Sequence, residues 1–265
     1  MLASVRPLMP SLRCGLAVLL VLALSACGGG GHKPTVTQAK PPVSGKADTP
    51  PAPADDAKSL LQRLEGAATA PSCDAIRGVL HSYYGTITDL ACRAIQAQLA
   101  GFHGAQAATY GLGALVTYKD ANDQPHTAVF ALDADRRYRM VYIDDGDGTG
   151  TKPGPTFAVA ASGVIAALRS GDCDALLRDL DRRIGLGIGP DREVCRNVGA
   201  SLLRREILGT PGARPRALGG NERVAFFELR SAPGRYYTLV LRQPVAATGS
   251  AVTPRVVLVN AIPAD

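Results

Sequence analysis

The sequence predicts an α+β protein of two tandem domains, each with about three helices followed by an antiparallel sheet. An internal repeat supports two copies, because Cys73-Asp74-Ala75-Ile76 recurs as Cys173-Asp174-Ala175-Leu176, and Cys92-Arg93 recurs as Cys195-Arg196. Both copies also have the same order of patterns, with apolar residues at helical spacing first and strand-like segments last. Helices segregated from hairpins are typical of α+β domains.

Three helices are predicted in each copy from apolar spacing and capping residues. The first helices have a period near 3.6, with apolar faces of Leu60, Leu61, Leu64, Ala67 and Ala68 in one copy and of Val164, Ile165 and Leu168 in the other. The second helices follow Ser72 and Asp172, since Ser and Asp accept hydrogen bonds from the free N–H groups at a helix start. The third helices begin at Thr88 and at Pro190.

Strands are predicted at about 112–119, 126–133 and 137–144 in the first copy, and at about 222–230, 235–243 and 254–262 in the second. Turn residues separate them at Asn122-Asp123, near Asp135 and at Pro233-Gly234. We therefore expect one domain over residues 58–145 and another over 156–265. The linker is residues 146–155, a stretch rich in Gly, Thr and Pro.

The N-terminus has the pattern of an export signal. Arg6 and Arg13 precede an apolar run, Leu16–Leu24, that is shorter than the roughly 20 residues needed to span a bilayer. The next residues, Leu24-Ser25-Ala26-Cys27, resemble the lipobox of bacterial lipoprotein precursors. This resemblance implies removal of a signal peptide, residues 1–26, and attachment of diacylglycerol and a further acyl chain such as palmitate to Cys27. An uncleaved anchor and an ordinary signal with an incidental cysteine are the alternatives.

Residues 27–57 are predicted to form a disordered tether rich in Gly and Pro. It would hold the folded domains away from a lipid surface. The residue after the cysteine is Gly28 and not Asp, which in lipoproteins implies the outer membrane of a two-membrane bacterium. In a one-membrane bacterium the protein would stay on the cell membrane. In either case the lipid-anchored chain would face the periplasm or the exterior.

Four of the six cysteines remain for disulfides, because Cys14 leaves with the leader and Cys27 takes lipid. An oxidising compartment favours two disulfide bonds. Of the three pairings that four cysteines allow, the repeat favours Cys73–Cys92 and Cys173–Cys195.

The segment Ile165-Ala166-Ala167-Leu168-Arg169-Ser170-Gly171-Asp172-Cys173 resembles the start of many exported members of the SnoaL-like superfamily, which includes nuclear transport factor and ketosteroid isomerase. The resemblance implies a cone-shaped domain in which helices pack on a curved antiparallel sheet. The first copy departs from it, with Ala70-Pro71-Ser72-Cys73 at the matching place. No functional residue carries over.

The sequence indicates no catalytic residue, metal site or cofactor site. His32, His81, His103 and His126 match no zinc-binding spacing, and structural or surface roles are expected for them. The run Asp144–Gly150 resembles a calcium loop, but Thr156 stands where an EF-hand needs Glu, so an acidic turn is the better interpretation. An isomerase would need a buried acid facing a tyrosine. Tyr83, Tyr84, Asp89, Tyr236 and Tyr237 are candidates, for which ordinary packing is expected, with one tyrosine of the strand pair in the core.

Composition limits the partners. Removal of the leader, which has two arginines and no acidic residue, would leave 27 basic and 23 acidic residues, a net charge of +4. This weak, dispersed charge argues against a nucleic-acid partner. We predict a non-catalytic binding protein of the envelope that contacts the membrane through its lipid and binds an envelope protein. The alternatives are a carrier of a small apolar ligand in a cone-shaped pocket and a degenerate enzyme of the same superfamily.

Overall fold

The structure is a computed structural model that describes residues 50, 52–69, 72–82, 87–146, 152–179, 181, 214–232, 235–244 and 252–263. All of them belong to one compact unit, Lys46–Asp265. Several predicted features lie outside the described residues, namely the leader, Cys27, most of the tether, Tyr83, Tyr84, the turn at Pro233-Gly234, Cys195 and the third helix of the second copy.

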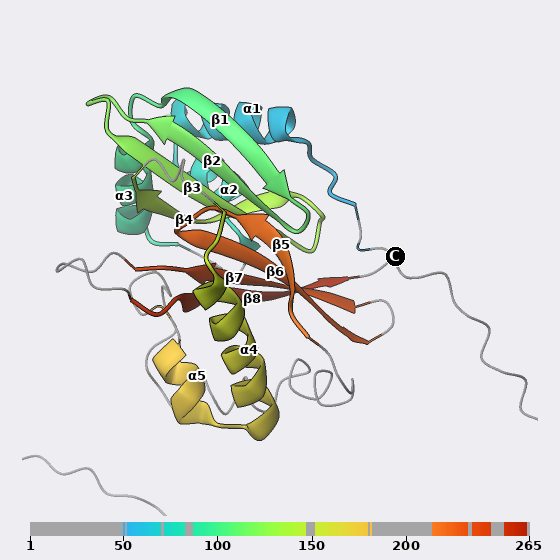
Figure 1. Ribbon diagram of the computed structural model, residues 1–265. Coiled ribbons are helices and arrows are strands. Elements are labelled where there is room, and N and C mark those ends of the chain that lie inside the picture. The colour runs from blue at the N-terminus through green and yellow to red at the C-terminus, as the bar shows by residue number, and fades with distance from the viewer. Residues whose placement is uncertain are drawn as a thin grey trace, which may run out of the picture. The chain divides into compact units, whose positions relative to one another are not determined.

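The first half of this unit is three helices followed by a four-stranded antiparallel sheet (Figure 1). The strands lie in the order β1-β2-β3-β4, so each pairs with its neighbour in the chain. The helices are α1 (Ala57–Thr69), α2 (Cys73–Val79) and α3 (Asp89–Leu99), and the strands are β1 (His103–Tyr110), β2 (Gly113–Lys119), β3 (Pro125–Leu132) and β4 (Tyr138–Asp145).

The second half repeats this order in its described part. Two helices precede a second antiparallel sheet, whose strands lie in the order β5-β6-β7-β8. Cys73 and Cys173 are each the first residue of a seven-residue helix, so the sequence repeat coincides with a repeat of local structure. The elements are α4 (Pro155–Ser170), α5 (Cys173–Asp179), β5 (Arg216–Gly220), β6 (Val224–Ala232), β7 (Arg235–Arg242) and β8 (Arg255–Pro263).

The prediction of an α+β protein with antiparallel sheets is confirmed, but each sheet has one strand more than the sequence indicated. The unpredicted strands are β1 and β5. Both are rich in Ala and Gly and lack the alternating apolar pattern by which strands are recognised. The third helix of the first copy begins after Thr88 as predicted, and α3 ends at Leu99.

The predicted caps are correct for two of the three described helix starts. The Thr88 hydroxyl accepts from the N–H of Ala91, and Asp172 Oδ1 accepts from the N–H of Ala175. Ser72 is the N-cap residue of α2 with an extended backbone, but its side chain makes no capping hydrogen bond. Ala54, which precedes residue 58, donates its N–H to the carbonyl of Arg136.

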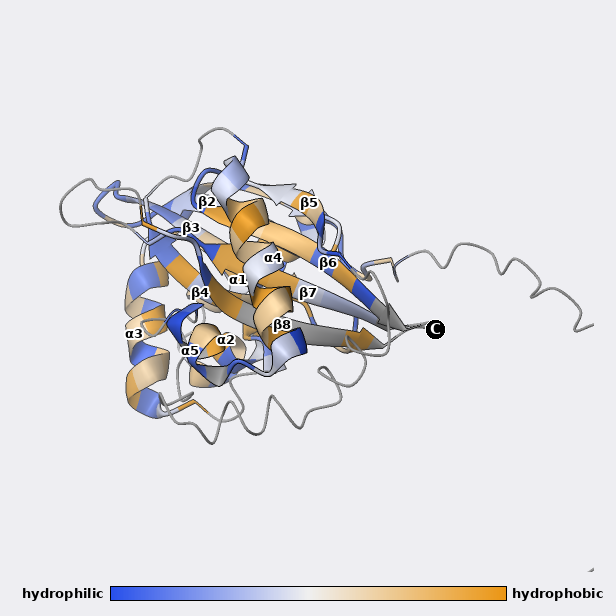
Figure 2. Ribbon diagram, turned by 60° about the horizontal axis from the view of Figure 1, so that its bottom comes forward, coloured by the Kyte–Doolittle hydropathy of each residue, from blue (hydrophilic) through white to orange (hydrophobic). Residues whose placement is uncertain are grey.

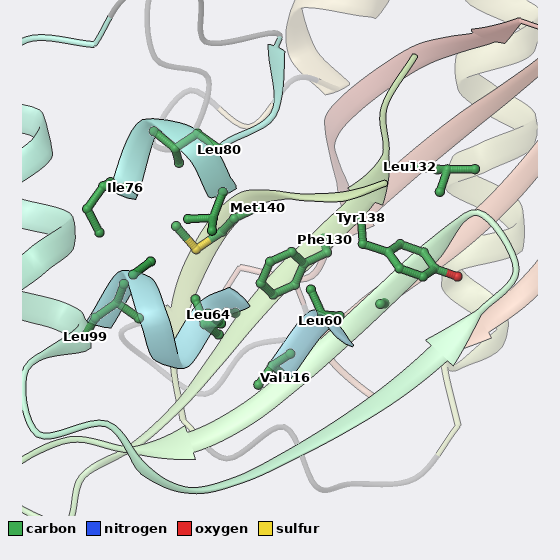
Figure 3. Close-up of a cluster of buried hydrophobic side chains, with 14 of the residues drawn as sticks. Leu60, Leu64, Ile76, Leu80, Leu99, Val116, Phe130, Leu132, Tyr138 and Met140 are labelled. Atoms are coloured by element: carbon green, nitrogen blue, oxygen red, sulfur yellow. The ribbon is translucent and has the colours of Figure 1, made fainter. Parts of the chain in front are cut away.

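The first core lies between α1–α3 and the first sheet. Helix side chains point toward those of the strands in Figure 3, and Leu64, Ile76, Leu99, Phe130 and Met140 are almost fully buried. A second core lies between α4–α5 and the second sheet, where Phe157, Leu168, Phe227 and Leu241 belong to one apolar cluster. Each sheet therefore has one face covered by the helices that precede it in the chain.

The other faces of the two sheets pack against each other. Leu115, Val129 and Val141 from the first sheet form an apolar cluster with Phe226 and Val240 from the second. The rings of Tyr110 and Phe226 stack at 5.8 Å between centroids, and a Cβ on Gly113 would overlap the ring of Phe226. Strands β3 and β7 thus bury side chains on both of their faces, and Figure 2 shows apolar residues in strands of both sheets.

This packing corrects the expectation that only one of Tyr236 and Tyr237 lies in the core. Neighbours on a strand point to opposite faces, and both faces of β7 are covered. Tyr236 is 1% exposed and belongs to the first core, whereas Tyr237 is 3% exposed and belongs to the second.

None of the described helices combines the length and the apolar character that a membrane span requires.

Cys73 and Cys92 form a disulfide between α2 and α3, with 5.8 Å between their Cα atoms. This is the first of the two pairs that the repeat predicts. The second pair lies outside the described side chains, because nothing is described of the Cys173 side chain or of Cys195.

Removing the first disulfide should destabilise the protein. The bond closes a loop of 19 residues, for which chain entropy assigns about 3 kcal/mol. We expect the variant Cys73→Ala/Cys92→Ala to lose about this much free energy of unfolding in urea denaturation. A reductant should then destabilise this variant further if Cys173 and Cys195 are also paired. A variant as stable as the natural protein would contradict the first expectation.

Candidate functional site between the two sheets

Buried charges gather at one end of the layer between the sheets. We call Tyr142, Asp144, Asp181, Arg223 and Arg242 the inter-sheet charge cluster. Tyr142 and Asp144 lie on β4, Arg242 ends β7, Arg223 precedes β6 and Asp181 follows α5. The cluster thus draws on both halves of the chain.

Arg242 is the centre of the cluster. Its Nη2 lies 2.7 Å from Asp144 Oδ1, and its Nη1 lies 3.1 Å from Asp181 Oδ2. Arg223 Nη2 lies 2.9 Å from the other oxygen of Asp144, and Arg223 Nη1 donates to the backbone carbonyl of Asp145. Asp144 therefore lies between two guanidinium groups, one from the residue before β6 and one from the last residue of β7, which lie side by side at the open end of the hairpin.

Backbone pairing at the ends of the strands explains how these side chains are positioned. Gln243 N–H donates to the carbonyl of Arg223, which closes the hairpin beside both arginines. Asp181 N–H donates to the carbonyl of Val256 on β8, which holds Asp181 against the same end of the sheet. The arginines lie opposite β4 because the sheets pack face to face.

The buried surroundings alter the acid–base properties of the cluster. Burial alone would lower the pKa of Arg242, but the hydrogen bond and negative charge of Asp144 outweigh it and raise that pKa. Burial and the negative charge of Asp144 raise the pKa of the Tyr142 hydroxyl well above its ordinary value. Both groups therefore keep their protons at neutral pH, and neither can act as a base.

The charges of the cluster balance, with two guanidinium groups against two carboxylates. The guanidinium carbon of Arg242 lies 5.8 Å from the centroid of the Tyr142 ring, which adds a cation–π contact. Within the described part of the chain, the Tyr142 hydroxyl has no hydrogen-bond partner. The arrangement suits a structural ionic lock between the two sheets better than a site for proton transfer.

This cluster corrects the interpretation of Asp144 and Asp145 as part of an acidic turn. Both residues end β4, and Asp144 is only 5% exposed. Asp147–Gly150, the rest of the run that resembles a calcium loop, lies outside the described residues. In the described part of the chain, no three His, Cys, Asp or Glu side chains come together to hold a metal ion.

Two of the three described histidines are buried. His126 lies between two carboxylates, with Nε2 3.4 Å from Asp120 Oδ2 and Nδ1 3.4 Å from Asp145 Oδ1, and it stacks on Tyr118. His103 is exposed and lies 3.2 Å from Asp123. His81 is 1% exposed and precedes Ser82, whose hydroxyl donates to Asp133. Because that hydroxyl donates to the carboxylate and not to an imidazole, these residues lack the geometry of a nucleophile activated by a histidine.

His81 should make stability depend on pH. Burial lowers its pKa below the ordinary value of 6.5, although the charge of Asp133 and a hydrogen bond to the backbone of Leu132 act in the opposite direction. The unfolded chain therefore binds more protons than the folded chain below pH 6.5. The stabilisation from neutral His81 is complete above the pKa of this residue in the unfolded chain. It is lost as the pH falls through the lower pKa of His81 in the folded chain.

We expect the free energy of unfolding, measured in urea, to fall between about pH 7.5 and about pH 5.5. The variant His81→Gln should show a smaller slope over this range. His103→Gln is the matched control, because hydrogen bonds to Gly101 and Asp123 raise the pKa of this exposed histidine and give the opposite sign. Equal slopes for His81→Gln and the natural protein would contradict the assignment.

The other candidates have ordinary surroundings. Asp89 is exposed in the first turn of α3 and pairs with Arg77 at 3.3 Å, so it is no buried acid facing a tyrosine. Tyr138 donates its hydroxyl hydrogen to the carbonyl of Gly111, and Tyr118 donates to that of Gln98.

No family model matches the sequence. A search of curated proteins gives no significant match either.

Proposed function

We propose that the protein is a lipid-anchored, extracytoplasmic binding protein of the bacterial envelope, without catalytic activity. The observation that carries the proposal is the sequence Leu24-Ser25-Ala26-Cys27 directly after the apolar run Leu16–Leu24. A lipid on Cys27 would hold the chain at a membrane surface, since two or more acyl chains give stable anchoring.

The proposal includes two tandem domains, over residues 58–145 and 156–265, that descend from one duplicated unit of the SnoaL-like type. The repeated Cys-Asp-Ala motif at the start of α2 and α5 supports this relationship. Each copy would carry its own disulfide, Cys173–Cys195 in the second. Residues 146–155 would be the linker and residues 27–57 the tether.

Binding through the surface is favoured over binding in a cone-shaped pocket. The side chains that would line a cone over the first sheet, such as Val116, Phe130 and Met140, pack against Leu60 and Leu64 of α1 in one buried cluster (Figure 3). A small apolar ligand would have to displace these helix side chains. Recognition of an envelope protein by exposed faces requires no such rearrangement.

The anchoring is tested by expressing the full chain and the variant Cys27→Ser in a bacterium. The mature natural protein should begin at Cys27, carry acyl chains by mass spectrometry and sediment with membranes. The variant should lose the acyl mass and leave the membrane fraction. A natural protein that is cut elsewhere, or that retains its leader, would refute the lipidation.

The binding role is tested with the purified mature protein by native mass spectrometry and by cross-linking in intact envelopes. A reproducible cross-link to one envelope protein, lost when that protein is deleted, supports the proposal. A stoichiometric apolar ligand would favour the carrier, and turnover of a defined substrate would favour an enzyme. Either of these results would overturn the proposed role.

A further inference from the structure

Among the described strands, β1 is an edge of the first sheet and pairs with β2 alone. Tyr110 pairs with Gly113 across a two-residue turn, in which Gly111 has a φ of 62°. In such a hairpin the residues beside the turn exchange hydrogen bonds, and the backbone groups then alternate in direction along the strand. The N–H and C=O groups of Tyr110 and Ala108 therefore face β2, whereas those of Ala107 and Thr109 face outward.

The outward groups of Ala107 and Thr109 have no backbone hydrogen-bond partner among the described residues. The opposite edge of the same sheet is covered. His81 N–H donates to the carbonyl of Met140 on β4, and Arg63 Nη2 donates to that of Tyr138. The edge strand β5 is short and ends in Gly219 and Gly220, whose φ angles of 138° and 136° interrupt regular pairing.

The sequence of β1, His-Gly-Ala-Gln-Ala-Ala-Thr-Tyr, contains no Lys, Arg, Asp, Glu or Pro. Edge strands of soluble proteins usually carry charges, proline or a β-bulge that prevent pairing with another chain. The register of β1 shifts between His103 and Gln106, so its regular edge is the stretch Gln106–Tyr110. Ala108 and Thr109 are exposed, so small side chains allow a strand to approach the outward edge. A charged peptide would find no opposite charge on this strand.

We propose that β1 pairs antiparallel with β1 of a second copy of this chain and joins the two four-stranded sheets edge to edge. Pairing centred on Ala107 places Ala107 opposite its own copy and Gln106 opposite Ala108, inside the stretch Gln106–Tyr110 that pairs with β2 in regular register. All these side chains are uncharged, so self-pairing brings no like charges together. The two-fold arrangement is closed, because both outward edges are used once.

The first test is a disulfide cross-link in the full-length protein expressed in a bacterial envelope. Paired residues that exchange hydrogen bonds across antiparallel strands have Cα atoms about 5.5 Å apart, within the range for a disulfide. Ala107→Cys should therefore give a cross-linked dimer on a non-reducing gel. Ser162→Cys, exposed on α4, is the matched control and should remain monomeric. A dimer yield for Ala107→Cys no greater than for the control would overturn the proposal.

The second test adds Thr109→Pro to Ala107→Cys. Proline removes the outward N–H of residue 109 and leaves the bonds of Ala108 and Tyr110 to β2 in place. We expect a roughly tenfold loss of dimer, the effect of about 1.4 kcal/mol. Thr109→Lys, which places a charge on the edge, should have the same effect if the proline variant does not fold. A folded variant of either kind that dimerises as before would refute the pairing.

Discussion

Replacing Arg242 with methionine should lower the free energy of unfolding by about 3–5 kcal/mol, because it removes a guanidinium group that pairs with two buried carboxylates. Asp144 and Asp181 have side chains 5% and 3% exposed, and both lie within 3.1 Å of the Arg242 guanidinium. Arg223 would still pair with Asp144, but Asp181 would lose its ion pair with Arg242. The measurement is urea denaturation followed by circular dichroism.

Two control variants distinguish this effect from a general loss of charge. Arg77→Met removes two ion pairs of a side chain that is 39% exposed, one to Asp74 and one to Asp89, whose side chains are 87% and 77% exposed. The expected loss is at most about 1 kcal/mol. Arg242→Lys keeps the charge, but a lysine ammonium cannot pair with both carboxylates as the guanidinium does. Its loss of stability should therefore lie between those of Arg77→Met and Arg242→Met. If Arg242→Met and Arg77→Met lose equal stability, the cluster is no ionic lock.

Much of the secondary structure could be predicted because it depends on local patterns. The apolar face of Leu60 and Leu64 predicts α1, and both side chains are buried as expected. Asn122-Asp123 and Asp135 predict the turns around β3, and Asp123 and Arg136 have the positive φ angles that tight turns require. In each case a few neighbouring residues determine the conformation.

The packing of the two sheets could not be predicted in the same way, although the sequence contained a signal. All residues of β3 after Pro125 are buried, and its run Ala128-Val129-Phe130-Ala131-Leu132 has no alternation with polar residues. A continuous apolar run indicates a strand covered on both faces. The apolar run does not indicate which element covers the second face of the strand. We expected helices to cover one face of each sheet, and the second sheet covers the other face.

The inter-sheet charge cluster was missed for a related reason. Asp144 and Arg242 are 98 residues apart, and Asp181 and Arg242 are 61 apart. Each residue by itself is a charge at the end of an apolar segment, as at the end of most strands. Which of these charges meet depends on how the sheet that contains β4 packs on the sheet that contains β6 and β7.

A loss of stability as large as that of Arg242→Met is expected for Phe130→Ala in the first core, about 3–5 kcal/mol. Phe130 is 1% exposed and is paired in register with Ala114 on β2 and Met140 on β4. Its ring lies among side chains from the helices and the sheet (Figure 3), so the cavity left by alanine would adjoin several elements. Small neighbours such as Ala114 and Ala128 cannot extend to fill it.

Leu90→Ala is the control for this substitution, because Leu90 is 80% exposed on α3 and should change stability by no more than about 0.5 kcal/mol. The first core also includes Tyr236 and Ile262 of the second sheet, so both halves should unfold in one transition. In Phe130→Ala, the urea midpoint of the whole protein, followed by circular dichroism, should therefore fall. The midpoint for proteolytic cleavage within residues 152–263 of the same protein should fall by the same amount. If the second half keeps its natural midpoint, the two halves unfold independently and the contact between the sheets contributes little stability.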